Sequence, residues 1–466
     1  MRFLLSMASA LALAACAAGP DYTAPRPRVA ASGPFLSTSP AVTTAPVQGD
    51  WWRLYKDPVL DKLVTDALAA NTDVRVAVAN LAKARASLRE VRADRFPQAS
   101  VGGSAQYGRL PASQRPVGAK QEDWFVDVGL DVSYEVDLFG RVSRGIEAGR
   151  ADLGAAQADL EAVRVSVVAE TTRAYADAAS AGERLDVARH IVALLDRSID
   201  LTRKREEVGL ATRLDTARIE ALRNQRQAEV PQLEAERQAA LFRLATLTGR
   251  APAELPAEVG ARTTTLRLDQ PIPVGDGAAL LARRPDVRAA ERRLAAATAR
   301  IGVATADLYP RITLGGSAGS TGTGFDNIFG ANPLTWLLGP LLNWTVNQDA
   351  ARARVKGAEA DSQAALATFD GTVLNALQET ETALSAYGKA LERRTALQAA
   401  RDSAEVATRI TRARQREGTI DSLELLDAER TFADAQADLA AADARIADAQ
   451  VDLFRALGGN WQRSGA

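Results

Sequence analysis

The sequence has little of what enzyme centres and nucleic-acid-binding surfaces are built from. One cysteine and one histidine, Cys16 and His190, leave no possible intrachain disulfide and little metal or thiol chemistry. The 57 basic residues are balanced by 58 acidic ones, so no basic excess points to nucleic acid. A glycine-rich phosphate loop, paired histidines and a nucleophile motif are also absent. We therefore expect no enzyme, no cofactor, no metal site and no nucleic-acid partner.

Aromatic residues and proline are scarce as well. Aromatics make up 5% of a chain that is 47% hydrophobic, and alanine supplies the difference. Ala-rich, charge-rich sequence favours closely packed helices over a bulky core. Residues 140–208 and all residues after Pro340 lack proline. A continuous helix of about 70 residues would span roughly 100 Å, far longer than a globular domain needs; Gly182 is a point where it could soften or break.

Two glycine turns punctuate these long segments. Residues 209–218 read GLATRLDTAR and residues 418–427 read GTIDSLELLD, each between two helical stretches. We interpret them as the tips of two helical hairpins, at residues 140–247 with a tip near 209 and at residues 350–457 with a tip near 418. Pro231 is expected to kink the return helix of the first hairpin.

In two other segments, apolar and polar side chains alternate with a period of two residues. In residues 124–136 apolar side chains occupy every second position, and mostly polar or small ones lie between them. We predict strand hairpins at residues 98–136 and 311–346, with Pro340 as a local fault. A soluble sandwich could have such strands, but their length and their acidic second face also suit tilted strands of a transmembrane barrel.

The layout occurs twice. Residues 73–105 match residues 286–318 at a constant offset of 213, for example Asp73-Val74-Arg75 against Asp286-Val287-Arg288. Four strands per chain cannot close a barrel, and open sheet edges are not tolerated in lipid. Three copies would give twelve strands. The predicted parts are a signal peptide (1–15), a tether (16–50), a first repeat (51–249), an equatorial connector (250–280), a second repeat (281–459) and a tail (460–466).

The N-terminal residues have the pattern of a targeting segment. A short apolar run, too short to span a membrane, follows Arg2 and ends at Cys16. The motif Leu13-Ala14-Ala15-Cys16 resembles a bacterial lipoprotein cleavage site, which predicts acylation of Cys16; the alternative is an ordinary signal peptide with a chance cysteine. Because Ala17 follows and not Asp, the lipoprotein sorting pattern implies the outer membrane.

The chain resembles the outer-membrane factor family of TolC-like proteins and, within it, the OprM/NodT-type efflux lipoproteins, over nearly its whole length. One departure is residues 347–352, NQDAAR, where the family commonly has a Phe-Asp-Gly-Gly-Arg-like turn. The motifs that carry the resemblance are LAAC at 13–16, GPDY at 19–22, DWW at 50–52, DPVL at 57–60, YEVDLFGR at 134–141 and RRPDVRAAE at 283–291.

The resemblance implies a mainly α-helical, internally duplicated TolC-like fold. Each chain of a homotrimer would give four strands to a twelve-stranded outer-membrane barrel, on a long periplasmic helical coiled-coil barrel. It implies a passive exit duct for an inner-membrane transporter, usually of the resistance-nodulation-division type, joined through a periplasmic adaptor (membrane fusion) protein. The chain would be lipid-anchored and embedded among outer-membrane lipids. Alternatives are a duct for type I protein secretion or, in a different class, a periplasmic coiled-coil scaffold or adaptor lipoprotein.

The resemblance also assigns roles at the tips. Counting from the turn glycine places Glu424 and Asp427 at the family's acidic gate, where carboxylates from three copies would meet and attract cations. Asp215 and Arg218 would form an intrahelical pair or ties that hold the gate shut. The alternative is solvated side chains on exposed helices and plain helix–loop–helix turns. The residues expected to meet the adaptor are Val208, Gly209, Leu210, Glu417, Gly418 and Thr419.

Overall fold

The structure is a computed structural model that describes residues 17–25, 32–37, 39–45, 49–109, 111, 113, 120–268, 270–323, 325, 334–420 and 422–459. The chain divides into two compact units. Unit 1 comprises residues 1–26, 80–157 and 289–370, and unit 2 comprises residues 27–79, 158–288 and 371–466. Within the described residues, no helix combines the length and the apolar character needed to cross a bilayer.

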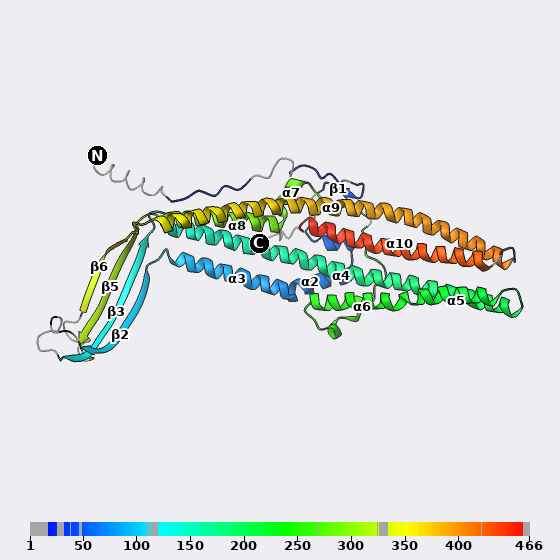
Figure 1. Cartoon of the computed structure of the whole chain (residues 1–466), viewed down its shortest axis with the longest axis horizontal. Coiled ribbons are helices and arrows are strands. Elements are labelled where there is room, and N and C mark those ends of the chain that lie inside the picture. The colour runs from blue at the N-terminus through cyan, green and yellow to red at the C-terminus, as the bar shows by residue number, and fades with distance from the viewer. Residues whose placement is uncertain are drawn as a thin grey trace. The chain divides into compact units, whose positions relative to one another are not determined.

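Unit 1 contains a four-stranded antiparallel sheet in the order β2-β3-β5-β6 (Figure 1). The two hairpins therefore join through β3 and β5, one strand from each sequence repeat. The sheet ends in β2 on one side and β6 on the other, and neither edge has a partner strand among the described residues. The strands are β2 (Gln98–Arg109), β3 (Glu122–Val136), β5 (Arg311–Thr323) and β6 (Leu334–Asn343).

The register gives this sheet two different faces. Leu130 pairs with Val101 of β2 and Ala318 of β5, so apolar and small side chains share one face. Asp131 pairs with Ser100 and Ser317 on the other, polar face. Tyr107 and Trp124 are cross-strand neighbours on the apolar face, with ring centroids 5.7 Å apart.

Pro340 does not disturb β6, contrary to the expectation from the sequence. Pro340 pairs with Leu314 inside a continuous strand. Proline has no backbone N–H, so a sheet accepts it at an edge strand, where that donor need not reach a neighbour. Because β6 is an edge in this chain, its ladder with β5 remains intact.

The internal duplication found in the sequence is also present in the structure. Helix α3 (Thr72–Ala93) and helix α8 (Pro285–Ala306) each have 22 residues, and both of their bounds differ by 213. The strands that follow, β2 and β5, begin at Gln98 and Arg311, again 213 positions apart. The two repeats therefore build the same helix–strand unit at the same spacing.

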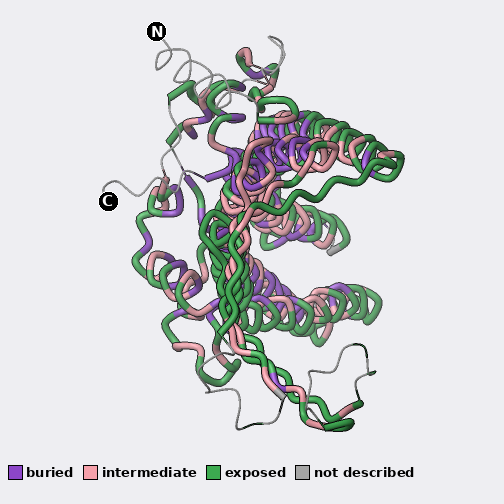
Figure 2. The backbone as a smooth tube through the Cα atoms, turned by 90° about the vertical axis from the view of Figure 1, so that its left-hand side faces the viewer, coloured by how far each residue is buried: buried purple, intermediate pink, exposed green. Residues whose placement is uncertain are grey.

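A very long helix follows each strand hairpin in the sequence. Helix α4 (Arg141–Glu207) has 67 residues and α9 (Asp349–Arg416) has 68. Gly182 does not break α4, contrary to one expectation; a Cβ there would lie 3.2 Å from Thr263 Cα, so glycine makes room for a passing segment. Figure 2 shows buried and exposed faces alternating along the helices. The return helices are α5 (Arg213–Gln227), α6 (Glu229–Leu247) and α10 (Ser422–Ala456).

The break between α5 and α6 has a local cause. It falls at Ala228, three residues before Pro231. Proline has no N–H to donate to the carbonyl four residues before it, so it interrupts the hydrogen bonds of a helix that reaches it from the N-terminal side. It is accepted in the first turn of a new helix, where this N–H would be unpaired anyway. Helix α5 therefore ends before Pro231, and Pro231 lies in the first turn of α6.

The main apolar core lies in unit 2. Trp51 stacks on Phe454 with ring centroids 4.5 Å apart, and both rings are almost fully buried. Asp57 caps α2 by accepting hydrogen bonds from the amides of Val59 and Leu60, and its second oxygen accepts from Tyr175 and Arg262. The remaining helices are the 3₁₀ turns η2 (Trp51–Tyr55), η4 (Pro252–Glu254) and η5 (Ala257–Gly260), and α2 (Pro58–Ala70) and α7 (Gly277–Arg283).

The expected tether is more tightly packed than its composition suggests. Phe35 is buried in the core of unit 2, and the amides of Leu36 and Ser37 donate to Glu381 at 2.7 and 2.9 Å. Strand β1 (Val42–Thr43) pairs in parallel with β4 (Ile272–Pro273) of the connector. A Pro- and Ala-rich segment can thus dock as extended chain when a helix and another extended segment supply the hydrogen-bond partners.

Candidate functional site: the two hairpin tips

The first tip is closed by a glycine with a left-handed backbone. Gly209 has φ +77°, and its amide donates to the carbonyl of Glu206 at 3.0 Å. The amide of Leu210 donates to the carbonyl of Arg205 at 2.7 Å. This is the Schellman arrangement, which satisfies the last carbonyls of α4. No atom lies within 4 Å of a Cβ placed at Gly209, so glycine is required here by backbone conformation and not by space.

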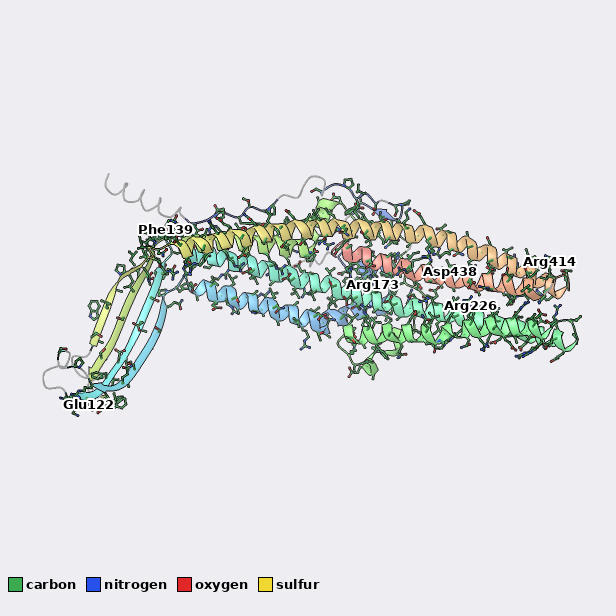
Figure 3. The ribbon with its side chains drawn as sticks, in the orientation of Figure 1. Glu122, Phe139, Arg173, Arg226, Arg414 and Asp438 are labelled. Carbon is green, nitrogen blue, oxygen red and sulfur yellow. The ribbon has the colours of Figure 1, made fainter. Side chains whose placement is uncertain are left out.

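The second tip repeats the same turn. Gly418 has φ +73°, its amide donates to the carbonyl of Gln415 at 3.0 Å, and the amide of Thr419 donates to the carbonyl of Arg414 at 3.0 Å. A Cβ at Gly418 also meets nothing within 4 Å. Figure 1 shows both tips at one end of unit 2, and Figure 3 labels Arg414 beside the second. Identical stop signals thus end α4 and α9.

Asp215 has a clear local role as part of a helix cap. The hydroxyl of Thr212 donates to its Oδ2 at 2.7 Å, and the amide of Thr212 donates to the same oxygen at 2.9 Å. In return the amide of Asp215 donates to Thr212 Oγ1, which completes a capping box at the start of α5. These hydrogen bonds from Thr212, with a smaller contribution from the charge of Arg218, lower the pKa of Asp215.

Arg218 and Asp427 are brought to one groove. The groove has a volume of about 370 Å³, lies between α5 and α10, and combines the two charged residues with apolar side chains. Glu424 lies in the first turn of α10, where a carboxylate is stabilised by the helix dipole. Both Glu424 and Asp427 are exposed in the single chain. The groove is lined by Arg218, Ala221, Leu222, Gln225, Leu423, Leu426, Asp427 and Arg430.

Direct polar contacts also tie the two hairpins together near the tips. Arg205 of α4 donates to the carbonyl oxygen of Gln415 in α9 at 3.0 Å. Further along, Glu429 of α10 accepts from Ser198 of α4 at 2.8 Å and from Arg412 of α9 at 3.1 Å. The Glu429 side chain is only 5% exposed, so this carboxylate joins three helices in a nearly dry contact.

A further tie runs from the first return helix to the second. Arg226 of α5 pairs with Asp434 of α10 and donates to Glu229 at 2.9 Å. The Arg226 side chain is 11% exposed, so its charge is met mainly by these two carboxylates. The hairpins are therefore bonded at three successive levels.

The first tip exposes three apolar side chains. Val208 and Leu210 flank the turn glycine with 69% of each residue exposed, and Leu214 in the first turn of α5 is 57% exposed. Glu417 and Thr419, beside the other turn glycine, are exposed too. Neighbouring exposed apolar side chains on a projecting turn are typical of a surface that meets another protein.

The sequence pointed to the turns and the acidic positions, but it did not reveal the ties between the hairpins. A Thr-x-x-Asp spacing at Thr212 could have indicated the capping box. No pattern marks Arg205 or Glu429, since their partners are 210 and 231 residues away in the chain. The proposed lipidation site, Cys16, lies outside the described residues.

Comparison with known proteins is consistent with this architecture. The family model described as "Outer membrane efflux protein" matches residues 63–250 and 278–459. The antibiotic efflux pump outer membrane protein ArpC of Pseudomonas putida is 31% identical, over 98% of this chain and 96% of that protein. The outer membrane protein OprJ of Pseudomonas aeruginosa is 32% identical, over 97% and 94%.

Solved structures have the same fold. The outer-membrane channel OprN superposes with a TM-score of 0.89 at 38% identity, over 96% of this chain and all of that chain. The open-state MtrE outer membrane channel of Neisseria gonorrhoeae gives 0.83 at 27% identity, over 96% and 99%. The chain therefore belongs to the outer membrane efflux protein family: it is an efflux channel of the outer membrane with a periplasmic portion, built on the internally duplicated TolC-like fold.

Proposed function

We propose that three copies of this chain join their sheets into one twelve-stranded barrel and act together as the exit duct of a tripartite pump. The observation that carries the proposal is the sheet β2-β3-β5-β6, which has two open edges and one apolar face. Unpaired strand edges are too costly in lipid for one copy to be stable there alone. Pairing β6 of each copy with β2 of the next removes every edge.

The side chains of β6 support the same conclusion. Leu334, Trp336, Leu338 and Leu342 share one face of the strand and are 69–76% exposed in the single chain. A continuous strip of this kind would be covered by lipid at the outside of a barrel. The opposite face of the sheet, with Asp127, Asp131 and Glu135 on β3, would line water.

The tips are proposed to form the periplasmic gate. Three copies of Glu424 and Asp427 around one axis would bring six carboxylates together. Close carboxylates repel one another, and their summed negative charge would attract cations to the constriction that they line. Arg218 in the groove beside Asp427 would moderate that charge, and the ties of Arg205 and Glu429 would hold the hairpins in the closed arrangement.

The turns are proposed to be the docking surface for a periplasmic adaptor, and through it for an inner-membrane transporter, which the family resemblance suggests is of the resistance-nodulation-division type. The exposed Val208, Leu210 and Leu214 support this assignment, with Gly209 and Gly418 setting the backbone. The names of relatives such as "antibiotic efflux pump outer membrane protein" support a drug-like cargo.

Acylation of Cys16 is proposed as a second membrane attachment. The motif Leu13-Ala14-Ala15-Cys16 and the position of the only cysteine support it. Each buried methylene of an acyl chain adds about 0.8 kcal/mol, so a multiply acylated residue anchors firmly. Labelling with a fatty-acid analogue should mark the wild type and not Cys16→Ser; label on Cys16→Ser would refute this assignment.

The duct itself is tested with purified protein in detergent and in planar lipid bilayers. Mass measurement should give three chains per particle, and the particle should conduct ions. A monomer without ion current would refute the proposal. The substitutions Leu338→Lys and Leu338→Asp, on the lipid face of β6, should abolish trimer formation. The substitution Thr335→Asp, on the opposite face, should leave the amount of trimer unchanged.

A further inference from the structure

Helices α3 and α9 lie at the two sides of unit 1, and both carry exposed cations next to the sheet. Side-chain contacts place α3 against α4, α4 against α8 and α8 against α9. Figure 1 shows α3 on the side of β2 and α9 on the side of β6. The exposed cations at the end of α3 and the start of α9 are Arg89, Arg92, Arg95, Arg352, Arg354 and Lys356.

These six cations are not neutralised within the chain. None of their side chains has an ion-pair or hydrogen-bond partner among the residues that the structure describes. Only three carboxylates, those of Glu90, Asp94 and Asp349, lie at the same level of the two helices. Positive charge in the first turn of a helix opposes the helix dipole, so Arg352 does not stabilise α9.

The equivalent junction inside the chain is neutralised by opposite charges. Arg141, at the start of α4, donates to both carboxylate oxygens of Glu135 on β3 at 2.7 Å. Arg144, one turn further along α4, pairs with Asp21 and Glu147 at 2.6 and 2.8 Å. The first cations of α4 therefore have partners, whereas those of α9 do not.

The repeated sequence shows that this fold does not need cations at the end of α3. At the repeat offset of 213, the three arginines of α3 correspond to Gly302, Thr305 and Leu308, none of which is charged. Helix α8 has α4 and α9 as neighbours in its own chain. The unpaired cations are thus found on the two outer helices, beside the strand edges β2 and β6, which have no partner among the described residues.

The six cations lie where the apolar face of the sheet ends. Leu342 of β6 pairs with Ile312, and Ile312 pairs with Val136, so this face stays apolar to the last residues of the strands. Phe96, two residues before β2, and Trp344, the residue after β6, are 68% and 50% exposed. Exposed aromatic side chains mark the boundary between hydrocarbon and water in membrane proteins. The cations begin just beyond that boundary, at the level of the lipid headgroups.

We infer that anionic phospholipid headgroups bind between copies of the chain, at a seam formed by residues 89–95 of one copy and residues 349–356 of the next. The inference rests on the proposed trimer, in which β6 of each copy pairs with β2 of the next. That pairing brings the cationic start of α9 beside the cationic end of α3. The two sets of like charges repel each other, and a lipid phosphate between them attracts both.

Further from the sheet, the same two helices have opposite charges at matching levels. Lys83 and Arg85 are about 12–15 Å from the end of α3, and Glu359 and Asp361 are about 15–18 Å from the start of α9, at 1.5 Å per residue. These cations and carboxylates can pair directly between copies. The requirement for an outside anion is therefore confined to the seam.

The lifetime of the wild-type trimer in different lipids is the direct test. The full-length protein is placed in nanodiscs of phosphatidylethanolamine alone or of phosphatidylethanolamine and phosphatidylglycerol in a four-to-one ratio, and heated. Native mass spectrometry follows the remaining trimer. We expect dissociation to be about tenfold slower with phosphatidylglycerol, because each cation at an anionic surface adds to the binding. Equal rates in the two lipids would overturn the lipid site.

Removing the cations from one side of the seam should abolish this lipid effect. The variant combines Arg89→Gln, Arg92→Gln and Arg95→Gln, all at exposed positions. In phosphatidylethanolamine alone its trimer should last at least as long as that of the wild type, because the repulsion between copies is gone. Phosphatidylglycerol should then slow dissociation by about twofold or less. A variant that keeps the full tenfold effect would contradict the seam.

A matched control removes three exposed cations from the long helices outside the seam. It combines Lys204→Gln, Arg393→Gln and Arg409→Gln, and it should keep the full effect of phosphatidylglycerol. Loss of the effect in this control as well would indicate a general charge effect and overturn the site. Inorganic phosphate added to the phosphatidylethanolamine discs separates a lipid headgroup from a free anion. If phosphate alone stabilises the trimer as well as phosphatidylglycerol does, the lipid assignment is wrong.

These outcomes separate the lipid site from the proposed function. A protein that is monomeric in both kinds of disc refutes the trimer, and the seam with it. A trimer that conducts ions and has the same lifetime in both lipids leaves the duct intact and overturns the lipid site alone.

Discussion

Arg205 donates a hydrogen bond to the carbonyl oxygen of Gln415, which also accepts from the turn amide of Gly418. One side chain of the first hairpin therefore binds the final turn of the second. Gln415 is itself buried, whereas the turn glycines are exposed. This hydrogen bond lies next to the tips, so a change in the distance between the two hairpins there would break it.

We predict that Arg205→Ala loosens the tips with little effect on the fold. A hydrogen bond from a charged donor contributes about 1.5–3 kcal/mol, which would shift a closed–open equilibrium at least tenfold. Single-channel recording should show higher open probability, with an unchanged thermal midpoint. Arg203→Ala, which removes an exposed pair with Glu220 inside the first hairpin, is the control. Equal open probability in all three proteins would contradict the role of the tie.

Glu424→Ala combined with Asp427→Ala tests the gate. Removing the carboxylates from a constriction should raise conductance and weaken block by divalent cations, because fewer charges retain the ion. Asp438→Ala, an exposed acidic position further along α10, should change neither property. Conductance equal to that of the wild type in the double variant would remove both residues from the gate.

A pH dependence is expected from the half-buried acid pair Asp177 and Asp448 of unit 2. Burial, together with the nearby carboxylate of Asp448 on α10, raises the pKa of Asp177 on α4 to about 6, against the opposing charges of Arg173 on α4 and Arg243 on α6. Asp452 pairs with Arg173, and Arg445 lies 3.8 Å from Asp448.

The sign follows from the direction of that shift. A raised pKa means that the folded state binds the proton more tightly than the unfolded chain does, so stability is greatest when Asp177 is protonated and falls as pH rises from about 4 to 6. The thermal midpoint should therefore be higher near pH 5 than at pH 7, by roughly 1–2 °C. Asp177→Asn should raise the midpoint at pH 7 and flatten the profile. A profile identical to that of the wild type would disprove the assignment.

The effect on stability of substituting a turn glycine should depend on the backbone conformation alone, because no other atom lies near its Cβ position. Gly209→Ala forces a Cβ into a left-handed conformation at a cost of about 1–2 kcal/mol, although there is open space around it. Gly209→Asn should lose less, since asparagine tolerates this region. The contrasting substitution is Gly357→Ala in α9, which should stabilise by about 0.5–1 kcal/mol. Denaturation midpoints in the order Gly357→Ala, wild type, Gly209→Asn, Gly209→Ala would agree with this account; Gly209→Ala equal to the wild type would not.

Local rules of the chain determined a large part of this protein by themselves. Proline-free stretches and glycine stops predicted the long helices and their turns, since helix termination is decided within a few residues. The period-two pattern predicted strands, and the repeat offset of 213 predicted that helix and strand units recur, as α3 and α8 do. Because the family motifs are also local, the resemblance drawn from them led to the fold class that the solved structures confirm.

Only the tertiary structure decided which distant residues meet. Arg205 with Gln415, Glu429 with Ser198 and Arg144 with Ala18 are separated by 210, 231 and 126 positions, and no periodicity encodes such pairs. The same holds for residues 35–37 and 39–43, which composition describes as an extended tether but which pack on unit 2 through Phe35 and strand β1. Composition describes what a segment can bury on its own, whereas docking depends on the surface that another segment presents.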